Sequence, residues 1–92
     1  MATRVQRRRT RGWGMPENTI YVGRPSRWGN PYPVLTYGRQ GSVERFRKYA
    51  LDRLDREPDW LDPLYGKDLA CWCPLNLLCH ADVLLELLKE RR

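Results

Sequence analysis

Several residue types and segments that define large classes of protein are scarce in this chain. Only one histidine, one phenylalanine and three cysteines occur among its 92 residues. The longest nearly apolar run, Val83 to Leu88, is interrupted by Glu86, whereas a helix that spans a bilayer needs about 20 apolar residues. No apolar segment follows the basic N-terminus, as a secretory signal would require. The sequence therefore argues against a membrane protein and against a classically secreted one.

The small and odd number of cysteines also excludes a fold that depends on disulfide bonds. Three cysteines without a signal sequence indicate a reducing compartment, and we expect a cytoplasmic protein. The length accommodates one domain, and 41% hydrophobic residues with four tryptophans are too many for a wholly disordered chain. We therefore expect a single small domain with a thin core.

Acidic residues are missing from the first 14 positions, which carry five of the arginines. The net charge of the whole chain is +6, so most of its excess lies in this segment. The sequence predicts a disordered basic arm at residues 1–14, followed by the folded domain at residues 15–92. The arm either binds the phosphates of a nucleic acid or only keeps the chain in solution. Its candidate phosphate ligands are Arg4, Arg7, Arg8, Arg9 and Arg11.

The pattern of apolar residues predicts a small α/β or α+β domain. Strands are expected at residues 19–22 and 68–73, and helices at residues 42–56 and 80–89. Ser42 is a suitable N-cap for the first helix, and Pro58 ends it. This order is that of a βαβα unit, and residues 33–37 are expected to add a third strand beside the first. In the connector at residues 57–66, we expect Trp60 and Leu61 to turn inward.

All cysteines and the single histidine lie within ten residues, in the pattern Cys-x-Cys-x5-Cys-His. The candidate metal ligands are therefore Cys71, Cys73, Cys79 and His80, which form a complete tetrahedral set for a structural zinc ion. A second interpretation places the cysteines in the core as small buried side chains, with His80 capping a helix. In a third, Cys73 or Cys79 is a nucleophile and His80 is its base. The sequence leaves all three open.

The loop at residues 23–31 contains two arginines, a tryptophan, two glycines, two prolines, a serine and an asparagine. Arginine beside tryptophan suits a phosphate group with a stacked base or sugar, and the loop follows a strand, where ligand sites of α/β domains lie. The candidate ligand-binding residues are Arg24, Ser26, Arg27, Trp28 and Asn30. Alternatively, the loop is structural, with Trp28 covering the edge of the core.

These two motifs are expected to meet if the two predicted strands are parallel. Loops that follow parallel strands leave the sheet at the same edge. Arg24, Trp28 and Asn30 would then face the start of the final helix, near His80, across one cleft. Antiparallel strands would instead send the two loops to opposite ends of the domain.

The segments at residues 21–31, 66–74 and 79–84 together resemble a family of small phage and bacterial proteins, domain of unknown function 4326. The similarity extends over about residues 18–88. The hallmarks of the family correspond here to Gly23, Arg24, Trp28, Gly29, Asn30, Pro31, Gly66, Cys71, Cys73, Cys79 and His80. The resemblance implies a phage or prophage origin and hence the cytoplasm of a bacterial host. It implies no particular activity.

Three functions of different classes remain open from the sequence. We favour a small accessory protein that binds nucleic acid or a phosphate-containing ligand through the arm and the loop. The alternative is a small enzyme that acts on a nucleotide-like substrate, with Cys73, Cys79 and His80, or a zinc ion, as its catalytic groups. A third is an inhibitor that binds a host protein. The scarcity of carboxylates within both motifs argues against the enzyme.

Overall fold

The computed structural model describes residues 2–90 and contains three strands, two α-helices and one short 3-10 helix. In chain order these elements are β1 (Arg4–Gln6), β2 (Thr19–Tyr21), α1 (Val34–Arg56), η1 (Asp62–Leu64), β3 (Asp68–Cys71) and α2 (His80–Glu90). The predicted α+β architecture with two helices is confirmed. Both predicted strands and both predicted helices are present, with shifted ends.

The sheet is parallel throughout, and β3 is its central strand. The order is β1–β3–β2, with Val5 opposite Ala70 and Ile20 opposite Leu69. Because β3 is hydrogen-bonded on both edges, its residues from Leu69 to Cys71 are buried, and this explains its apolar sequence. Because the strands are parallel, the carboxyl ends of all three lie at the same end of the sheet, and this end is called its carboxyl edge below.

The third strand is not the segment predicted to supply it. Residues 34–37 are helical, and their apolar side chains face outward, with Leu35 fully exposed. The third strand comes instead from the predicted disordered arm, because Arg4–Gln6 pair with β3. The amides of Leu69 and Arg7 extend this pairing to the carbonyls of Thr3 and Cys71. The expected disorder of residues 1–14 is therefore wrong for residues 4–6, since central β3 offers them a free edge.

Helix α1 begins eight residues before the predicted start, and it is kinked. Gly38 has φ 71° and ψ 163°, a conformation that is available almost only to glycine, and it separates a first turn from the main helix. Ser42 is consequently not the N-cap. Its side chain is fully buried, and its hydroxyl donates a hydrogen bond to the carbonyl of Tyr32. The helix ends at Arg56, before Pro58, as predicted.

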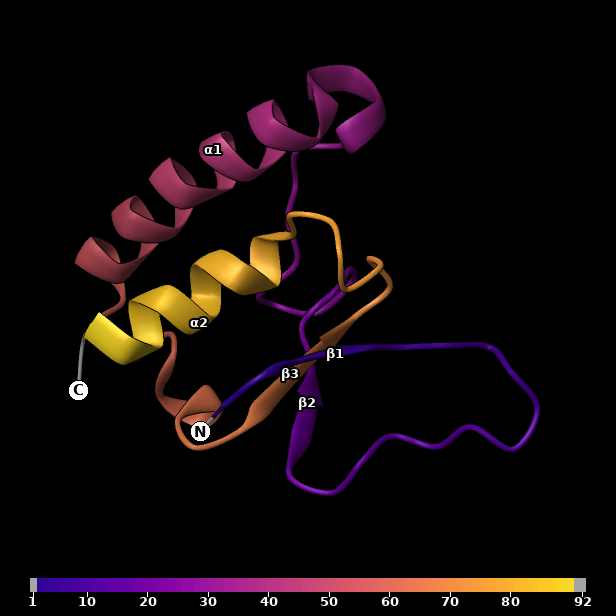
Figure 1. Ribbon diagram of the computed structural model, residues 1–92. Helices are drawn as coiled ribbons and strands as arrows, with labels where there is room; N and C mark the ends of the chain where they lie inside the picture. The colour runs from indigo at the N-terminus through magenta and orange to yellow at the C-terminus, as the bar shows by residue number, and fades with distance from the viewer. Residues whose placement is uncertain (1, 91–92) are drawn as a thin grey trace.

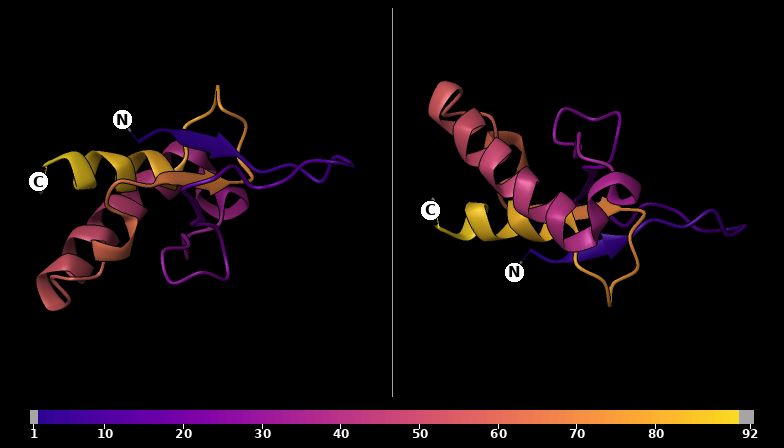
Figure 2. Two further views of the ribbon diagram at one scale, coloured as in Figure 1. Left: turned by 90° about the horizontal axis from the view of Figure 1, so that it is seen from below. Right: turned by 90° about the horizontal axis from the view of Figure 1, so that it is seen from above.

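The two helices lie on one side of the sheet, with α2 between α1 and the strands (Figure 1). The core fills the space between these layers and includes Phe46 of α1, Leu84 of α2 and Leu69 of β3. The connector after α1 contributes Trp60 and Leu61 to this core, as the sequence predicts. The chain between β1 and β2 extends away from both helices as a long loop (Figures 1 and 2). Among residues 2–90, no helix has both the length and the apolar composition required to cross a membrane.

Candidate ligand cavity and cysteine centre

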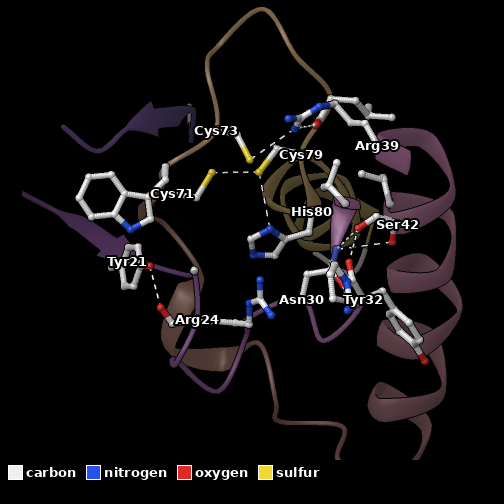
Figure 3. Close-up of a pocket in the computed structure, with 16 residues that line it drawn as sticks. Tyr21, Arg24, Asn30, Tyr32, Arg39, Ser42, Cys71, Cys73, Cys79 and His80 are labelled. Carbon is white, nitrogen blue, oxygen red and sulfur yellow. Dashed lines mark hydrogen bonds between the residues drawn. The ribbon is translucent and has the colours of Figure 1, made fainter. Parts of the chain in front are cut away.

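A cavity of about 310 Å³ lies at the edge of the sheet where β2 and β3 end (Figure 3). The loops that follow β2 and β3 both contribute to its wall, so the two sequence motifs meet at one cleft as expected, although Trp28 does not line it. The side chains in the wall include Tyr21, Arg24, Asn30, Tyr32, Arg39, Ser42, Cys71, Trp72, Cys73, Cys79 and His80. The wall contains two arginines and, among the residues that the structure describes, no carboxylate.

Two of the five predicted ligand-binding residues line this cavity, namely Arg24 and Asn30. The Arg24 side chain extends toward His80 (Figure 3), and none of the ion pairs within residues 2–90 includes it. The amide of Asn30 is engaged, because it donates to the Ser42 hydroxyl at 2.9 Å and accepts from the backbone amide of Tyr32 at 2.8 Å. Asn30 therefore attaches loop 23–31 to helix α1, whereas Arg24 is available to a ligand.

The other three predicted ligand-binding residues lie outside the cavity wall. Trp28 is buried in the core, and its indole nitrogen donates to the carbonyl of Trp60 at 2.9 Å. The Ser26 hydroxyl accepts a bond from the amide of Trp28, and Arg27 lies 3.8 Å from the carboxylate of Glu57. These contacts agree with the alternative interpretation, in which this part of the loop is structural and Trp28 covers the core.

Arg39 is a residue of the cavity that the sequence did not indicate. Its Nη1 donates to the carbonyl of Leu78 at 2.9 Å and lies 3.6 Å from the sulfur of Cys73. The residue follows the kink at Gly38, so the main part of helix α1 begins beside the cysteines. The sequence carried no signal for this role, because Arg39 lies in a stretch that reads as a turn on the solvent side.

The three cysteines form a compact cluster in the wall of the cavity. The Sγ atoms of Cys71, Cys73 and Cys79 all lie within 4.8 Å of one another, and those of Cys71 and Cys79 are 2.9 Å apart. Cys71 and Cys79 are buried, whereas Cys73 is half-buried. Cys71 is the last residue of β3, and Cys79 directly precedes helix α2. Because α2 packs against β3, the two ends of the loop between them lie close together. The three sulfurs are close enough to bind a metal ion.

His80 lies beside this cluster with one ring nitrogen already engaged. Its Nε2 is 2.8 Å from the carbonyl oxygen of Val22, and its Nδ1 is 3.6 Å from the sulfur of Cys79. Because a carbonyl only accepts, Nε2 carries the proton. Burial lowers the pKa of His80, so the ring is neutral and Nδ1 presents a lone pair toward Cys79. In metal-binding histidines, the ring nitrogen that does not bind the metal usually donates a hydrogen bond of this kind, which orients the ring.

The environment shifts the pKa values of the two buried thiols, Cys71 and Cys79, in opposite directions. The pKa of Cys79 is lowered, chiefly because the Cys71 and Cys73 thiols donate hydrogen bonds to its sulfur, with further support from the Ala81 amide and from Arg4. The pKa of Cys71 is raised by its hydrogen bonds to Cys73 and Cys79 and by burial. Cys79 is thus the first of the pair to form the thiolate that metal binding or nucleophilic attack requires.

The five arginines predicted to bind nucleic acid do not lie in one environment. Arg4 is directed into the fold, where its guanidinium meets the loop between Cys73 and Cys79. Arg7 lies over the rings of Tyr21 and Trp72, at 4.6 and 5.0 Å from their centroids, and Arg9 also lies over Trp72. Arg8, Arg9 and Arg11 are exposed. Trp72, which the sequence analysis did not select, therefore joins the basic segment to the mouth of the cavity.

A family model described as Domain of unknown function (DUF4326) matches residues 5–90. The chain belongs to this family. The resemblance seen in the sequence is confirmed, and the match also extends into strand β1, beyond the segments that carried that resemblance. No significant match was found among curated proteins or among solved structures.

The arrangement in this DUF4326 domain supports two kinds of chemistry. The first is recognition of an anion, since arginines line a cavity free of carboxylates among residues 2–90. The second is the binding of a thiophilic metal by the cysteine cluster, or thiolate chemistry at Cys79, with His80 beside it in either case.

Proposed function

We propose that this domain binds a nucleotide-like, phosphate-containing ligand in the cavity at the edge of the sheet. The observation that supports this most directly is the charge of the cavity wall. Arg24 and Arg39 line it, and no carboxylate of the described residues faces them. Arginine presents a planar set of donors that matches two phosphate oxygens at once.

The shape of the cavity agrees with a small ligand. Its volume of about 310 Å³ lies at the lower end of the range for small-molecule sites. Arg24 and Arg39 lie on different sides of it, so a nucleotide-like ligand could contact Arg24 from loop 23–31 with one part and Arg39 from helix α1 with another (Figure 3). Tyr21 and Trp72 supply aromatic surface at the rim for a base or sugar.

The basic segment extends this proposal from a nucleotide to a nucleic acid. Arg7 and Arg9 lie against Trp72, whose side chain is 40% exposed at the mouth of the cavity. Arg8 and Arg11 project from the same stretch into solvent. A polynucleotide whose terminal phosphate occupies the cavity would therefore have further cations along its backbone.

Titration calorimetry with a nucleoside monophosphate and with inorganic phosphate tests the cavity. We expect Arg24→Gln and Arg39→Gln each to weaken binding of the monophosphate by about tenfold or more, because each variant removes a charge-assisted hydrogen bond. Arg27→Gln is the matched control, since Arg27 belongs to the same loop but lies outside the wall. Equal affinity of Arg24→Gln and the wild type, or no binding of either probe, would contradict the proposal.

The cysteine cluster supports a second role, that of a zinc site which stabilises this thin domain. The supporting observation is the orientation of His80, whose Nδ1 lone pair points at the cluster. Ligand atoms of a tetrahedral zinc ion lie about 3.6–3.8 Å apart. The 3.6 Å between His80 Nδ1 and Cys79 Sγ matches this value, and the 2.9 Å between Cys71 and Cys79 would have to widen by less than about 1 Å. The three cysteines already lie within 4.8 Å of one another and are the first three ligands. His80 is proposed as the fourth; its Nδ1 is near Cys79 but is not part of this close group, so the ring would have to move toward the other two sulfurs.

Elemental analysis of protein purified without a histidine tag tests the zinc site. We expect about one zinc ion per chain, since the four donors form one tetrahedral set. Addition of a strong chelator should remove the ion and lower the melting temperature, because metal binding contributes to folding. A chain that contains no zinc after expression in zinc-supplemented medium, and takes up none on titration, would contradict this role.

A further inference from the structure

Arg4 is an arginine of the N-terminal segment whose side chain is buried rather than exposed. Only 7% of its side-chain surface is accessible to solvent. Its Nη2 lies 3.1, 2.7 and 2.8 Å from the carbonyl oxygens of Pro74, Leu75 and Leu77, and its Nε lies 3.4 Å from a carboxylate oxygen of Asp82. One side chain of strand β1 thus joins the loop at residues 74–78 to the first turn of helix α2.

Loop 74–78 determines where two of the cysteines lie. It connects Cys73 to Cys79 without any strand or helix, and its leucines are largely exposed, with Leu75 at 57% and Leu78 at 46%. Burial of apolar side chains therefore does little to fix its conformation. The carbonyl groups that Arg4 contacts are the main points at which this loop is attached to the rest of the fold, together with the bond from Arg39 to Leu78.

The guanidinium of Arg4 also has a donor without a partner. Its Nη1 is buried and has no hydrogen-bonding partner among the residues that the structure describes. The Asp82 carboxylate that pairs with this guanidinium also accepts the backbone amide of Cys79 at 3.0 Å, so Arg4 and Cys79 are linked through the first turn of helix α2. A buried donor without a partner is costly. A metal site with three thiolate ligands would place negative charge on the side of the fold where this donor lies.

We propose that Arg4 is a positioning residue of the metal site, and that metal binding and the docking of strand β1 stabilise each other. This inference rests on the proposed zinc site. Arg4 pairs with Asp82 and binds the carbonyls of loop 74–78, so it holds this loop, and with it the cysteines at both of its ends, in the position that the metal site requires. Because coupling between two binding events is reciprocal, the ion tightens β1 as much as β1 tightens the ion.

The test compares zinc affinities by competition with a chromophoric chelator for the wild type, Arg4→Gln, Arg4→Lys and Arg8→Gln. We expect Arg4→Gln to weaken zinc binding about 10- to 100-fold, as the loss of second-shell groups does. Arg4→Lys keeps the charge but has one nitrogen for all these acceptors, so its affinity should be intermediate. Arg8→Gln is the matched control, because Arg8 follows the same strand, is exposed and donates a hydrogen bond to the side chain of Gln6 rather than to loop 74–78.

Two measurements on the same proteins report the coupling itself. Hydrogen exchange of the peptide that covers residues 2–9 should slow on addition of zinc to the wild type and much less in Arg4→Gln. The sulfur-to-metal absorption bands of the cobalt-substituted protein should shift in Arg4→Gln and remain unchanged in Arg8→Gln. A role of Arg4 in general stability alone would move neither the bands nor the effect of zinc on exchange.

The outcomes separate this inference from the proposal beneath it. If the wild type binds zinc and Arg4→Gln binds it equally well, the inference is overturned and the zinc site stands. If the wild type binds no zinc, the proposed zinc site and the role of Arg4 in it are both contradicted. If Arg4→Gln does not fold, the affinity of Arg4→Lys and the exchange data for the wild type decide. Unchanged exchange of residues 2–9 on addition of zinc would then overturn the coupling.

Discussion

The imidazole of His80 donates a hydrogen bond through Nε2 to the carbonyl oxygen of Val22, over a distance of 2.8 Å. Val22 directly follows strand β2, and His80 is the first residue of helix α2, so this bond joins the two motifs that the sequence singles out. It also fixes the tautomer of the ring and directs the lone pair of Nδ1 at Cys79. One contact therefore connects the loop of the ligand cavity with the cysteine centre.

Replacement of a cysteine ligand should remove the stabilisation that zinc provides. We expect Cys73→Ser to lower the free energy of unfolding in the presence of zinc by several kcal/mol, because binding of a structural zinc ion contributes directly to folding. Denaturant unfolding with and without zinc measures this effect. Asn76→Ala, an exposed change in the neighbouring loop, is the control and should keep the full zinc effect. An equal response of Cys73→Ser and the wild type to zinc would show that Cys73 is not a ligand.

Trp28 should matter for stability and not for ligand affinity. Its indole is buried and donates to the carbonyl of Trp60, so Trp28→Phe leaves that carbonyl without its donor. We expect a loss of about 1–3 kcal/mol in the free energy of unfolding. The affinity for a nucleoside monophosphate should stay within about twofold of the wild type. Trp72→Phe, at the mouth of the cavity, is the comparison and should leave stability nearly unchanged. A large drop in affinity for Trp28→Phe would restore Trp28 as a ligand-binding residue.

The exposed arginines of the basic segment should determine how salt affects binding of a polyanion. Deletion of the segment is a poor test, since it removes strand β1 as well. The better variant replaces the three exposed arginines with glutamine, at Arg8, Arg9 and Arg11. We expect the slope of log K against log salt for duplex DNA to become less negative by at most about 2.7, since each cation contributes about 0.9.

The control for this experiment is a variant that removes the same charge from the helices. It carries glutamine at Lys48, Arg56 and Lys89, which are exposed and lie outside the cavity wall. The slope for this variant should stay close to that of the wild type. If the two triple variants change the slope equally, binding depends on total charge and the basic segment has no special part in it.

Two glycines of helix α1 should respond to alanine in opposite ways. Gly38 has φ 71° and ψ 163°, so Gly38→Ala should cost about 1–3 kcal/mol of stability, although nothing within 4 Å would meet the added methyl group. Gly41 lies within the helix, where a Cβ would only touch Tyr37 at 3.5 Å. Gly41→Ala should therefore stabilise the domain by up to about 1 kcal/mol. Thermal unfolding of both variants measures the difference, and equal melting temperatures would refute the role of the kink at Gly38.

The elements that the sequence predicted well are those with a local pattern of apolar residues, either at the helical period or as a short continuous run. Phe46, Ala50 and Leu54 recur at the helical period, and all three are buried in α1. Leu69 and Cys71 belong to a short apolar run that ends before Pro74, and this run forms the central strand. Periodicity of this kind is local, because it depends only on the residues of one element.

The errors concern segments whose role depends on a distant partner. Residues 33–37 were predicted to pair with the first strand, but residues 34–37 are helical and Leu35 points into solvent, and the strand paired with β2 is β3. Residues 4–6 read as part of a charged tail, yet they pair with β3 across more than 60 residues of chain. Trp28 has the composition of a stacking residue, but only the fold shows that the carbonyl of Trp60 accepts its N–H.

The sequence by itself determined the family, the two helices, strands β2 and β3 and the residues of the cysteine centre, because each is encoded by residues close together in the chain. Only the tertiary structure decided which arginines serve the site. Arg24 and Arg39 both line the cavity, and Arg4 turns inward to the loop before Cys79. The physical reason is that an arginine side chain is compatible with almost any exposed position. The packing of distant elements therefore determines which groups lie next to it, and hence its role.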